Sequence, residues 1–405
     1  MGAATQMSPE ELRRLRLQRL RLDKPLSAAP EALVQSLAAV QAQDYAGAKW
    51  ALGQRLARAT DAALEACFER GAIVRTHVMR PTWHFVAPQE LRWLQALTRA
   101  RVLLASASYF RKHGLDEKLL GKCRKIVEKA LSGKQLTRDE LALALVDGGV
   151  STNNDSIALV MLRLELDCVV ASGARRGKQF TYALFDERIP SSKQLEPEHA
   201  LSELALRYFT TRGPAQANDF AWWSGLSVKT AQHAIQLVGK RLLAAECDGK
   251  QYYFSEPAKP AKRGATVDVR LLSNYDEYLV AYKDRALLLP SAPSRGAFAR
   301  DLLLANHVVV RNGVVVGGFR RTLHKADVQI EVTLLESLDE AELSALEAEA
   351  ARYANFLGLS VDFERETAPL TQAIGEKLAG ARLSFFAKSA ASASFCASVF
   401  ERPRT

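Results

Sequence analysis

The chain contains little cysteine for its length, and this scarcity argues against two kinds of structure. Its five cysteines among 405 residues are odd in number, lie far apart and include no C-x-x-C pair; they are Cys67, Cys123, Cys168, Cys247 and Cys396. A disulfide framework and a zinc ribbon both need closely patterned cysteines. We therefore expect reduced thiols, as in a cytoplasmic protein.

Long apolar runs are also missing. No run approaches the 18 residues that a membrane span requires. Residues 8–24 are rich in arginine with interspersed leucines, which predicts an amphipathic helix and not a secretory signal. We expect no contact with a membrane.

What the chain does have is length, apolar residues and a moderate positive charge. At 405 residues it predicts two to four domains, and a hydrophobic fraction of 48% is enough for sizeable cores. Its 55 Lys and Arg exceed its 45 Asp and Glu, giving a formal net charge of +10. This excess favours nucleic acid as a partner, although charge alone is a weak indication.

Two glutamines interrupt an apolar stretch at residues 37–52. Gln41 and Gln43 are one residue apart and Asp44 follows at once. In extended backbone the two amides point to the same side, where they can hold a water, a phosphate or a base edge. An amide does not titrate and is no strong general base, so a reaction here needs a substrate already primed to react. A polar loop between two helices is the alternative.

The order of predicted elements repeats along the chain. Helices at 197–211, 215–224 and from Ser227 to about 240 precede a hairpin around Asp248 and Gly249, which is typical of a winged helix. Two earlier stretches show the same order. One has helices at 116–131, from Thr137 and at 152–167, then a hairpin with its tip at 173–178. The other has helices near 9–22, 30–39, 45–57 and 61–70, then strands at 72–79 and 82–87.

We therefore predict a mainly α fold with β-hairpin wings, of the α+β class. Its predicted units are 1–112, 113–190 and 196–258 as three tandem winged helices, 264–384 as a small α+β domain, and 385–405 as a Ser/Ala-rich tail that we expect to be poorly ordered. The last domain begins with a strand near 267, contains a hairpin at Asn312 and Gly313, and has an acidic helix at 339–357. The expected linkers are 186–196 and 255–264, which are rich in Pro, Lys and Ser.

Basic side chains concentrate in three places: residues 99–134, the hairpin tip at 175–178, and the segment after Asn312. The first of these contains ten Lys or Arg and only three Asp or Glu. Such charge neutralises phosphates without reading sequence. A solvated surface is the alternative interpretation. The candidate DNA contacts are Arg111, Lys112, Lys122, Arg124, Lys125, Arg175, Arg176, Lys178, Arg320 and Arg321.

Cofactor and metal signatures are absent. Residues 173–178 resemble a phosphate loop but are one residue short and lack the Ser or Thr that holds magnesium. His77 and His84 would face each other if their strands pair, but no third ligand is evident. We expect neither a metal nor a cofactor.

Five segments together resemble a known family, the AlkZ/YcaQ-type winged-helix DNA glycosylases. The first holds the Gln-Ala-Gln motif at residues 40–44 with Trp50. The others are residues 75–86, 212–226, 271–285 and 312–317, and the resemblance spans roughly residues 10 to 365 in consistent order.

This resemblance implies a bacterial enzyme with tandem winged helices around a DNA cleft, acting near the nucleoid. It implies excision of cationic N7-alkylated purines or unhooking of interstrand crosslinks in double-stranded DNA, with Gln41 and Gln43 as the catalytic pair. Asp44 either supplies a carboxylate near the developing charge or caps the helix that begins near Tyr45, and we expect the cap. Further cleft candidates by position are Arg80, Thr82, His84, Tyr275 and Asp276. A multi-module cleft works as a monomer, which is the state we expect.

Two alternatives remain open at this point. In the first, the chain is a non-catalytic winged-helix DNA-binding protein or transcriptional regulator. In the second, its fold serves contacts with other proteins. The enzymatic interpretation depends on both amides opening into a positively charged groove.

Overall fold

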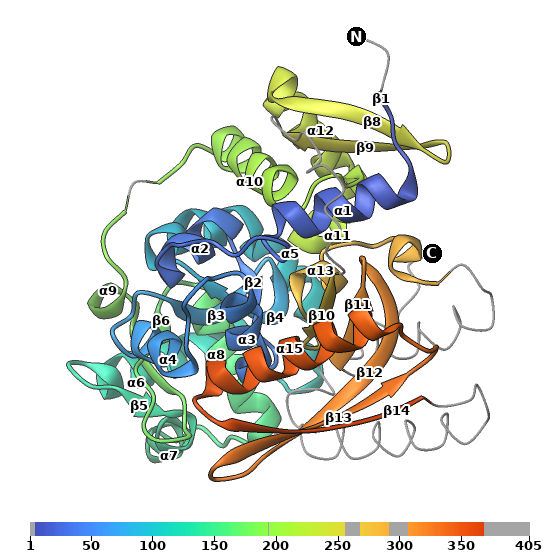
Figure 1. Ribbon diagram of the computed structural model, residues 1–405. Coiled ribbons are helices and arrows are strands. Elements are labelled where there is room, and N and C mark those ends of the chain that lie inside the picture. The colour runs from blue at the N-terminus through green and yellow to red at the C-terminus, as the bar shows by residue number, and fades with distance from the viewer. Residues whose placement is uncertain (1–4, 193, 256–267, 291–306, 368–405) are drawn as a thin grey trace.

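The computed structural model describes residues 5–192, 194–255, 268–290 and 307–367, and it shows a mixed α+β fold (Figure 1). The described strands form one five-stranded sheet and three sheets of three strands. Helices from the first two thirds of the chain surround the small sheets, while the five-stranded sheet forms the C-terminal side of the molecule.

The N-terminal region builds one small sheet among helices. The strand order is β2–β4–β3, with both neighbours antiparallel to the central strand. Two of its helices begin at side-chain caps: Ser8 starts α1 through a capping box with Glu11, and Thr60 caps α4. The elements are α1 (Pro9–Arg19), α2 (Pro30–Leu37), β2 (Val40–Gln41), α3 (Tyr45–Gln54), α4 (Asp61–Glu69), β3 (Val74–Val78), β4 (Arg80–Val86), η1 (Pro88–Glu90) and α5 (Leu91–Lys112).

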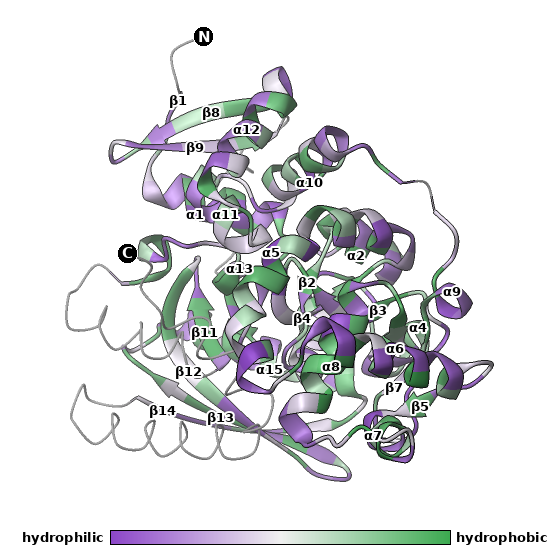
Figure 2. Ribbon diagram, turned by 180° about the vertical axis from the view of Figure 1, so that it is seen from behind, coloured by the Kyte–Doolittle hydropathy of each residue, from purple (hydrophilic) through white to green (hydrophobic). Residues whose placement is uncertain are grey.

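The second region also contains a hairpin, formed by β6 and β7. Thr137 and Glu140 form the capping box that starts its second helix, as the sequence predicts. The third helix, α8, is buried on nearly all sides and Figure 2 shows it as largely hydrophobic. The elements are α6 (Glu117–Leu131), β5 (Leu136–Thr137), α7 (Arg138–Asp147), α8 (Asn154–Leu166), β6 (Val170–Ser172), β7 (Thr181–Leu184) and α9 (Phe185–Arg188).

The third region contains the predicted hairpin at Asp248 and Gly249, with one addition. Strand β1 (Thr5–Gln6), from the start of the chain, pairs in parallel with β8 and completes a three-stranded sheet. Sequence periodicity gives no sign of a pairing between segments so far apart. The elements are α10 (Pro197–Thr211), α11 (Ala217–Ser224), α12 (Val228–Val238), η2 (Gly239–Arg241), β8 (Leu242–Cys247) and β9 (Lys250–Ser255).

The C-terminal region is a twisted sheet crossed on one face by α15 (Figure 1). Asn312 and Gly313 both have positive φ, at 49° and 81°, as the two central residues of a tight hairpin turn require. The last strand runs parallel to its neighbour. The elements are β10 (Val269–Leu272), α13 (Glu277–Val280), η3 (Ala286–Leu288), β11 (His307–Arg311), β12 (Val314–Leu323), β13 (Asp327–Leu334), α15 (Glu340–Leu357) and β14 (Ser360–Thr367).

The α+β class is confirmed, and the predicted helices and hairpins lie close to their expected positions. The 22-residue helix α5 and the strands β2 and β14 were not predicted. The division into three winged helices, with the stated boundaries, stays a prediction. The tail at 385–405 and most of the linker at 255–264 lie outside the described residues.

The first and last predicted units share one hydrophobic core. Trp50 of α3 donates its indole N–H to the carbonyl of Leu271 in β10 at 2.7 Å. Its ring also packs against Tyr353 and Phe356 of α15, with ring centroids 4.8 and 5.3 Å away. The segment that carries the two glutamines is therefore held between N-terminal helices and the C-terminal sheet.

Gly225 joins α11 to the turn between β3 and β4. It ends α11 in the left-handed conformation with φ of 72°, and a Cβ there would lie 2.2 Å from the carbonyl oxygen of Met79. Gly358 ends α15 with the same φ of 72° but has nothing within 4 Å of a Cβ. The two glycines share a backbone conformation and differ only in their surroundings.

We predict that Gly225→Ala destabilises the protein more than Gly358→Ala. Both substitutions carry a left-handed penalty of about 1–2 kcal/mol, and only Gly225→Ala adds an overpacking cost of about 1–3 kcal/mol. Urea unfolding of both variants measures the difference. Equal free energies of unfolding would show that the contact with Met79 relaxes without cost.

Candidate active site

Strand pairing places Gln41 beside the central strand β4. Gln41 lies opposite His84 and Val40 opposite Phe85. The amide N–H of Ala42 then donates to the carbonyl of Trp83 at 2.7 Å. The backbone before Gln43 is thus extended, as the spacing of the two amides requires.

One face of this sheet is polar although it is buried. Residues 80, 82 and 84 alternate along β4 and so share a face, and Gln41 and Thr76 lie opposite His84 on either side. Its members are Gln41, Thr76, Arg80, Thr82 and His84, all of them buried. We call these five residues the polar face.

Two hydroxyls of the polar face have no hydrogen-bond partner among the described residues. They are Oγ1 of Thr76 and Oγ1 of Thr82. Buried polar groups are nearly always paired with protein or water, so unpaired hydroxyls need an explanation. An ordered water or a polar group of a ligand satisfies them chemically.

A chain of hydrogen bonds crosses the polar face. Arg80 Nη2 donates to Gln41 Oε1 at 2.7 Å and lies 3.4 Å from His84 Nε2. His84 Nδ1 lies 2.9 Å from the carbonyl oxygen of Thr82. Burial, followed by the charge of Arg80, holds the pKa of His84 well below its usual range. His84 is therefore neutral and serves as a structural link in this chain.

The two glutamines differ in exposure. Gln41 is only 2% exposed, whereas Gln43 is partly exposed. Gln43 Oε1 lies 3.4 Å from the amide nitrogen of Trp83, a long contact, and its backbone carbonyl accepts from Arg75 at 3.4 Å. The expectation that both amides open to solvent is therefore met by Gln43 and not by Gln41.

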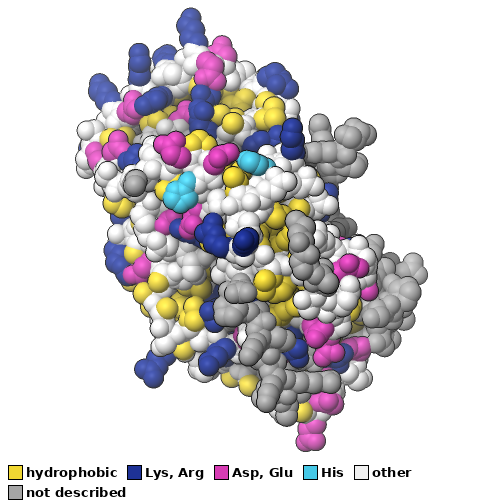
Figure 3. All heavy atoms as spheres, turned by 90° about the horizontal axis from the view of Figure 1, so that it is seen from above, with side chains coloured by type: hydrophobic (Ala, Val, Ile, Leu, Met, Phe, Trp, Pro, Cys, Tyr) yellow, Lys and Arg dark blue, Asp and Glu magenta, His cyan; other side chains and the backbone are white. Residues whose placement is uncertain are grey.

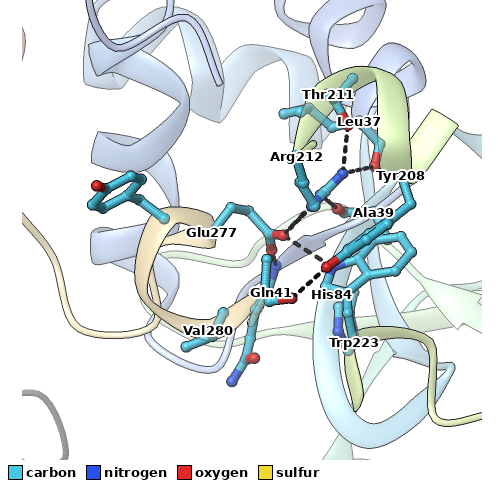
Figure 4. Close-up of polar contacts among 12 residues, drawn as sticks. Leu37, Ala39, Gln41, His84, Tyr208, Thr211, Arg212, Trp223, Glu277 and Val280 are labelled. Atoms are coloured by element: carbon cyan, nitrogen blue, oxygen red, sulfur yellow. Dashed lines mark hydrogen bonds and ion pairs between the residues drawn. The ribbon is translucent and has the colours of Figure 1, made fainter. Parts of the chain in front are cut away.

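A buried ion pair anchors the backbone of Gln41. Glu277 accepts from the Gln41 amide N–H at 2.8 Å and from Arg212 Nη2 at 2.7 Å (Figure 4). Trp223 also donates its indole N–H to Glu277 at 3.0 Å. Both charged side chains are 0% exposed. Sequence reasoning did not select Glu277 or Arg212, although both fall inside segments that resemble the family.

Asp44 does not cap helix α3 with its side chain, so that expectation is wrong. It occupies the N-cap position without a side-chain cap bond. Its carboxylate instead pairs with Arg321 of β12 at 3.2 Å, and Arg321 also donates to the hydroxyl of Tyr353. A tertiary partner has replaced the local one.

Asp276 is also committed elsewhere. It forms a two-point ion pair with Arg55, with both distances 2.8 Å, and its side chain accepts from the amide of Tyr278 to start α13. Tyr275 is partly exposed and has a positive φ of 66°. Asp276 therefore stabilises the loop that carries Glu277, and the structure gives it no open carboxylate.

His77 and His84 do not face each other. His77 pairs with Trp83 across the sheet, packs against its ring at a tilt with centroids 3.9 Å apart, and hydrogen-bonds Glu165 through Nδ1. His84 points to the opposite face. Within the part of the chain that the structure describes, no group of three His, Cys, Asp or Glu is arranged to hold a metal.

Two of the ten predicted DNA contacts are held in ion pairs and are mostly buried. Arg321, 11% exposed, pairs with Asp44. Arg175, 18% exposed, pairs with Glu65 at 3.1 Å and lies over the ring of Tyr45. Both arginines join parts of this chain, which leaves them poorly placed for phosphates.

The other eight basic residues are at least partly exposed, and some also have partners. Arg176 pairs with Glu140 at 2.7 Å, and Arg124 with Glu128 at 2.9 Å. These eight residues are Arg111, Lys112, Lys122, Arg124, Lys125, Arg176, Lys178 and Arg320. On the face shown in Figure 3, basic side chains are spread out with acidic ones between them.

No described helix combines the length and the apolar character that crossing a bilayer demands.

Comparisons with known proteins give one consistent result. A family model described as "DNA glycosylase AlkZ-like" matches residues 34–356. A curated relative from Streptomyces sahachiroi, named as an interstrand DNA cross-link repair glycosylase, is 26% identical over 360 residues, which cover 85% of this chain and 95% of the relative. The solved structure of the DNA glycosylase AlkZ of that organism is 24% identical and superposes with a TM-score of 0.72, over 89% of this chain and 100% of that one. The structural likeness shows a shared fold.

We predict that Glu277→Gln destabilises the protein by about 3–5 kcal/mol, because it leaves the buried charge of Arg212 without its partner. The matched control is Glu128→Gln, which removes an exposed helical pair and is expected to cost about 0.5 kcal/mol. Guanidinium unfolding measures both. A loss at Glu277 no larger than that of the control would mean that water or another group compensates Arg212.

Proposed function

The chain belongs to the AlkZ-like DNA glycosylase family, and we propose that it removes cationic N7-alkylated purines from DNA by attack of water on the deoxyribose. Members of this family are DNA glycosylases, and this chain shares their fold and their order of segments. The observation that carries the proposal is a pair of side-chain amides, Gln41 and Gln43, at the edge of the buried polar face.

The chemistry suits groups that do not titrate. An N7-alkylated purine carries a positive charge, so its bond to the sugar is already weakened and no acid is needed to protonate the leaving base. Its departure leaves a sugar with oxocarbenium character, which oriented dipoles stabilise and a positioned water attacks. His84 of the polar face is neutral, because burial and the charge of Arg80 hold its pKa well below its usual range. A site of this kind acts only on substrates that need no proton transfer to the leaving group.

The two amides take different parts in this proposal. Gln43, the exposed one, contacts the sugar or the attacking water directly. Gln41, held from behind by Arg80 and Glu277, lies deeper. Asp44 is paired with Arg321, so its charge is largely offset and we assign it no step.

The DNA partner follows from the family, and its form is part of the proposal. We propose that duplex DNA is bound by a monomer through the exposed basic residues between positions 111 and 178, with the three predicted units as winged helices. The curated relative is named for interstrand cross-link repair. We therefore include N7-linked crosslinks among the candidate substrates of this chain.

We predict that the wild-type protein releases N7-methylguanine from a duplex oligonucleotide and that Gln43→Ala slows release on the order of 10²-fold, the usual loss when one oriented dipole is removed. Single-turnover release, followed by cleavage of the abasic site, measures the rate. The control is Gln251→Ala, because Gln251 is an exposed residue of β9. Release no faster than without enzyme would refute the lesion assignment.

We predict that Lys112→Ala/Lys125→Ala/Lys178→Ala weakens duplex binding and lowers the slope of log affinity against log salt by about one for each phosphate that is no longer neutralised. The matched control is Lys24→Ala/Lys229→Ala/Lys240→Ala, which removes the same charge from other exposed positions. Fluorescence anisotropy at several salt concentrations measures both slopes. Equal slopes would place the phosphates elsewhere on the protein.

A further inference from the structure

The orientation of the Gln41 amide is determined by its partner. A guanidinium carries only donors, so the atom of Gln41 that lies 2.7 Å from Arg80 Nη2 must be the carbonyl oxygen. Amide oxygen and nitrogen are usually hard to tell apart from shape alone, but here the chemistry of the partner decides.

Arg80 is itself held in place by groups of known polarity. The carbonyl of Thr82 can only accept, so His84 Nδ1 carries the proton and donates to it at 2.9 Å. Because the lowered pKa of His84 keeps the ring neutral, its Nε2 is an acceptor, and it faces Arg80 Nη2 at 3.4 Å. The guanidinium nitrogen thus lies between two acceptors, the Gln41 carbonyl and the His84 ring.

The backbone of Gln41 is fixed as well. Its amide N–H is bound to Glu277, and strand pairing aligns it with His84. Figure 4 shows the side chain leading away from the Arg212–Glu277 ion pair. Among the described residues none accepts a hydrogen bond from Gln41 Nε2, so the NH₂ group is the part of this side chain with bonding capacity to offer.

Building on the base release proposed above, we propose that Gln41 donates a hydrogen bond to the departing purine, and that Arg80 is the positioning residue that sets this polarity. When the bond between C1′ and N9 breaks, its electron pair stays on the purine and cancels the positive charge. Electron density then rises on the purine acceptors N3 and O6. Water forms the new bond to C1′ and loses its proton to solvent.

A hydrogen-bond donor at this position stabilises the leaving base but would repel the positively charged sugar. The positive end of an NH₂ dipole repels an oxocarbenium-like carbon, and it stabilises an acceptor whose electron density grows. A carbonyl dipole toward the sugar is left to Gln43, whose Oε1 has only the 3.4 Å contact with Trp83. The two glutamines then act on opposite ends of the breaking bond.

The decisive variant is Gln41→Glu. It keeps an acceptor oxygen against Arg80 and gains an ion pair there, so the midpoint of thermal unfolding should not fall below that of the wild type. It replaces the NH₂ donor by an acceptor of the same shape. On a duplex with one N7-methylguanine, we expect single-turnover release at saturating enzyme to fall on the order of 10²-fold, with the dissociation constant for that duplex within about threefold.

Each other result overturns a stated part. A rate retained or raised in Gln41→Glu means that an acceptor works at this position, and the donor assignment is wrong. A larger dissociation constant for the duplex, with an unchanged rate at saturating enzyme, means that the NH₂ group binds a phosphate and not the base. No release by the wild type refutes the proposed function itself, which separates that failure from the failure of this inference.

Arg80 is tested by a pair of substitutions in two backgrounds. With Gln41 present, we expect Arg80→Met to lower the saturating rate at least about tenfold and Arg80→Lys, which still donates, to restore part of it. With Gln41→Ala, the same two substitutions should change the rate less than about threefold, because no amide is left to orient. Equal reductions in both backgrounds would show that Arg80 acts independently of Gln41.

Discussion

The arrangement around the two glutamines depends on one buried ion pair, Arg212 with Glu277. Arg212 also donates to the backbone carbonyls of Leu37 and Ala39, at 3.0 and 2.7 Å, and Glu277 accepts from the amide of Gln41. This ion pair therefore binds the backbone at three alternate residues, 37, 39 and 41, of the segment that leads into the site. Both charges are fully desolvated, which is tolerable only while each satisfies the other and the surrounding dipoles. The pair and the backbone that it holds come from three segments far apart in the chain, so the site exists only in the tertiary structure.

The polar face in front of this anchor works with dipoles of fixed direction. Arg80 sits between the Gln41 carbonyl and the neutral ring of His84, and the ring is oriented by the carbonyl of Thr82. Preorganised dipoles need no rearrangement as charge develops, which makes them effective in a site shielded from water. The arrangement also limits the substrate, because the polar face offers neither a strong acid nor a strong base. A base that already carries a positive charge meets that limit.

Much of the local structure could be predicted from the sequence. Thr137 and Ser227 start helices where their types predict, and Asn312 with Gly313 turns the predicted hairpin. The prediction for Asp44 was wrong for a physical reason: its type favours a helix cap, but Arg321, 277 residues away, offers a charge-assisted bond instead. Arg175 and Arg321 were predicted to contact phosphates; in the structure each is paired with a carboxylate, and a charge in a sequence does not reveal such a partner. Glu277 was overlooked for the same reason, since a single glutamate has no signature until Arg212 and Gln41 surround it.

The sequence by itself determined the α+β elements, the family and the candidate pair Gln41 and Gln43, because caps, turns and motifs depend on residues close together in the chain. The tertiary structure alone decided that Gln43 is the more exposed amide, that the carbonyl of Gln41 faces Arg80, and that β1 joins a hairpin more than 200 residues away. These facts rest on contacts between distant segments, whose energies local residue patterns do not encode. The orientation of the amide groups of Gln41 and Gln43 is therefore set only when the rest of the chain has packed around them.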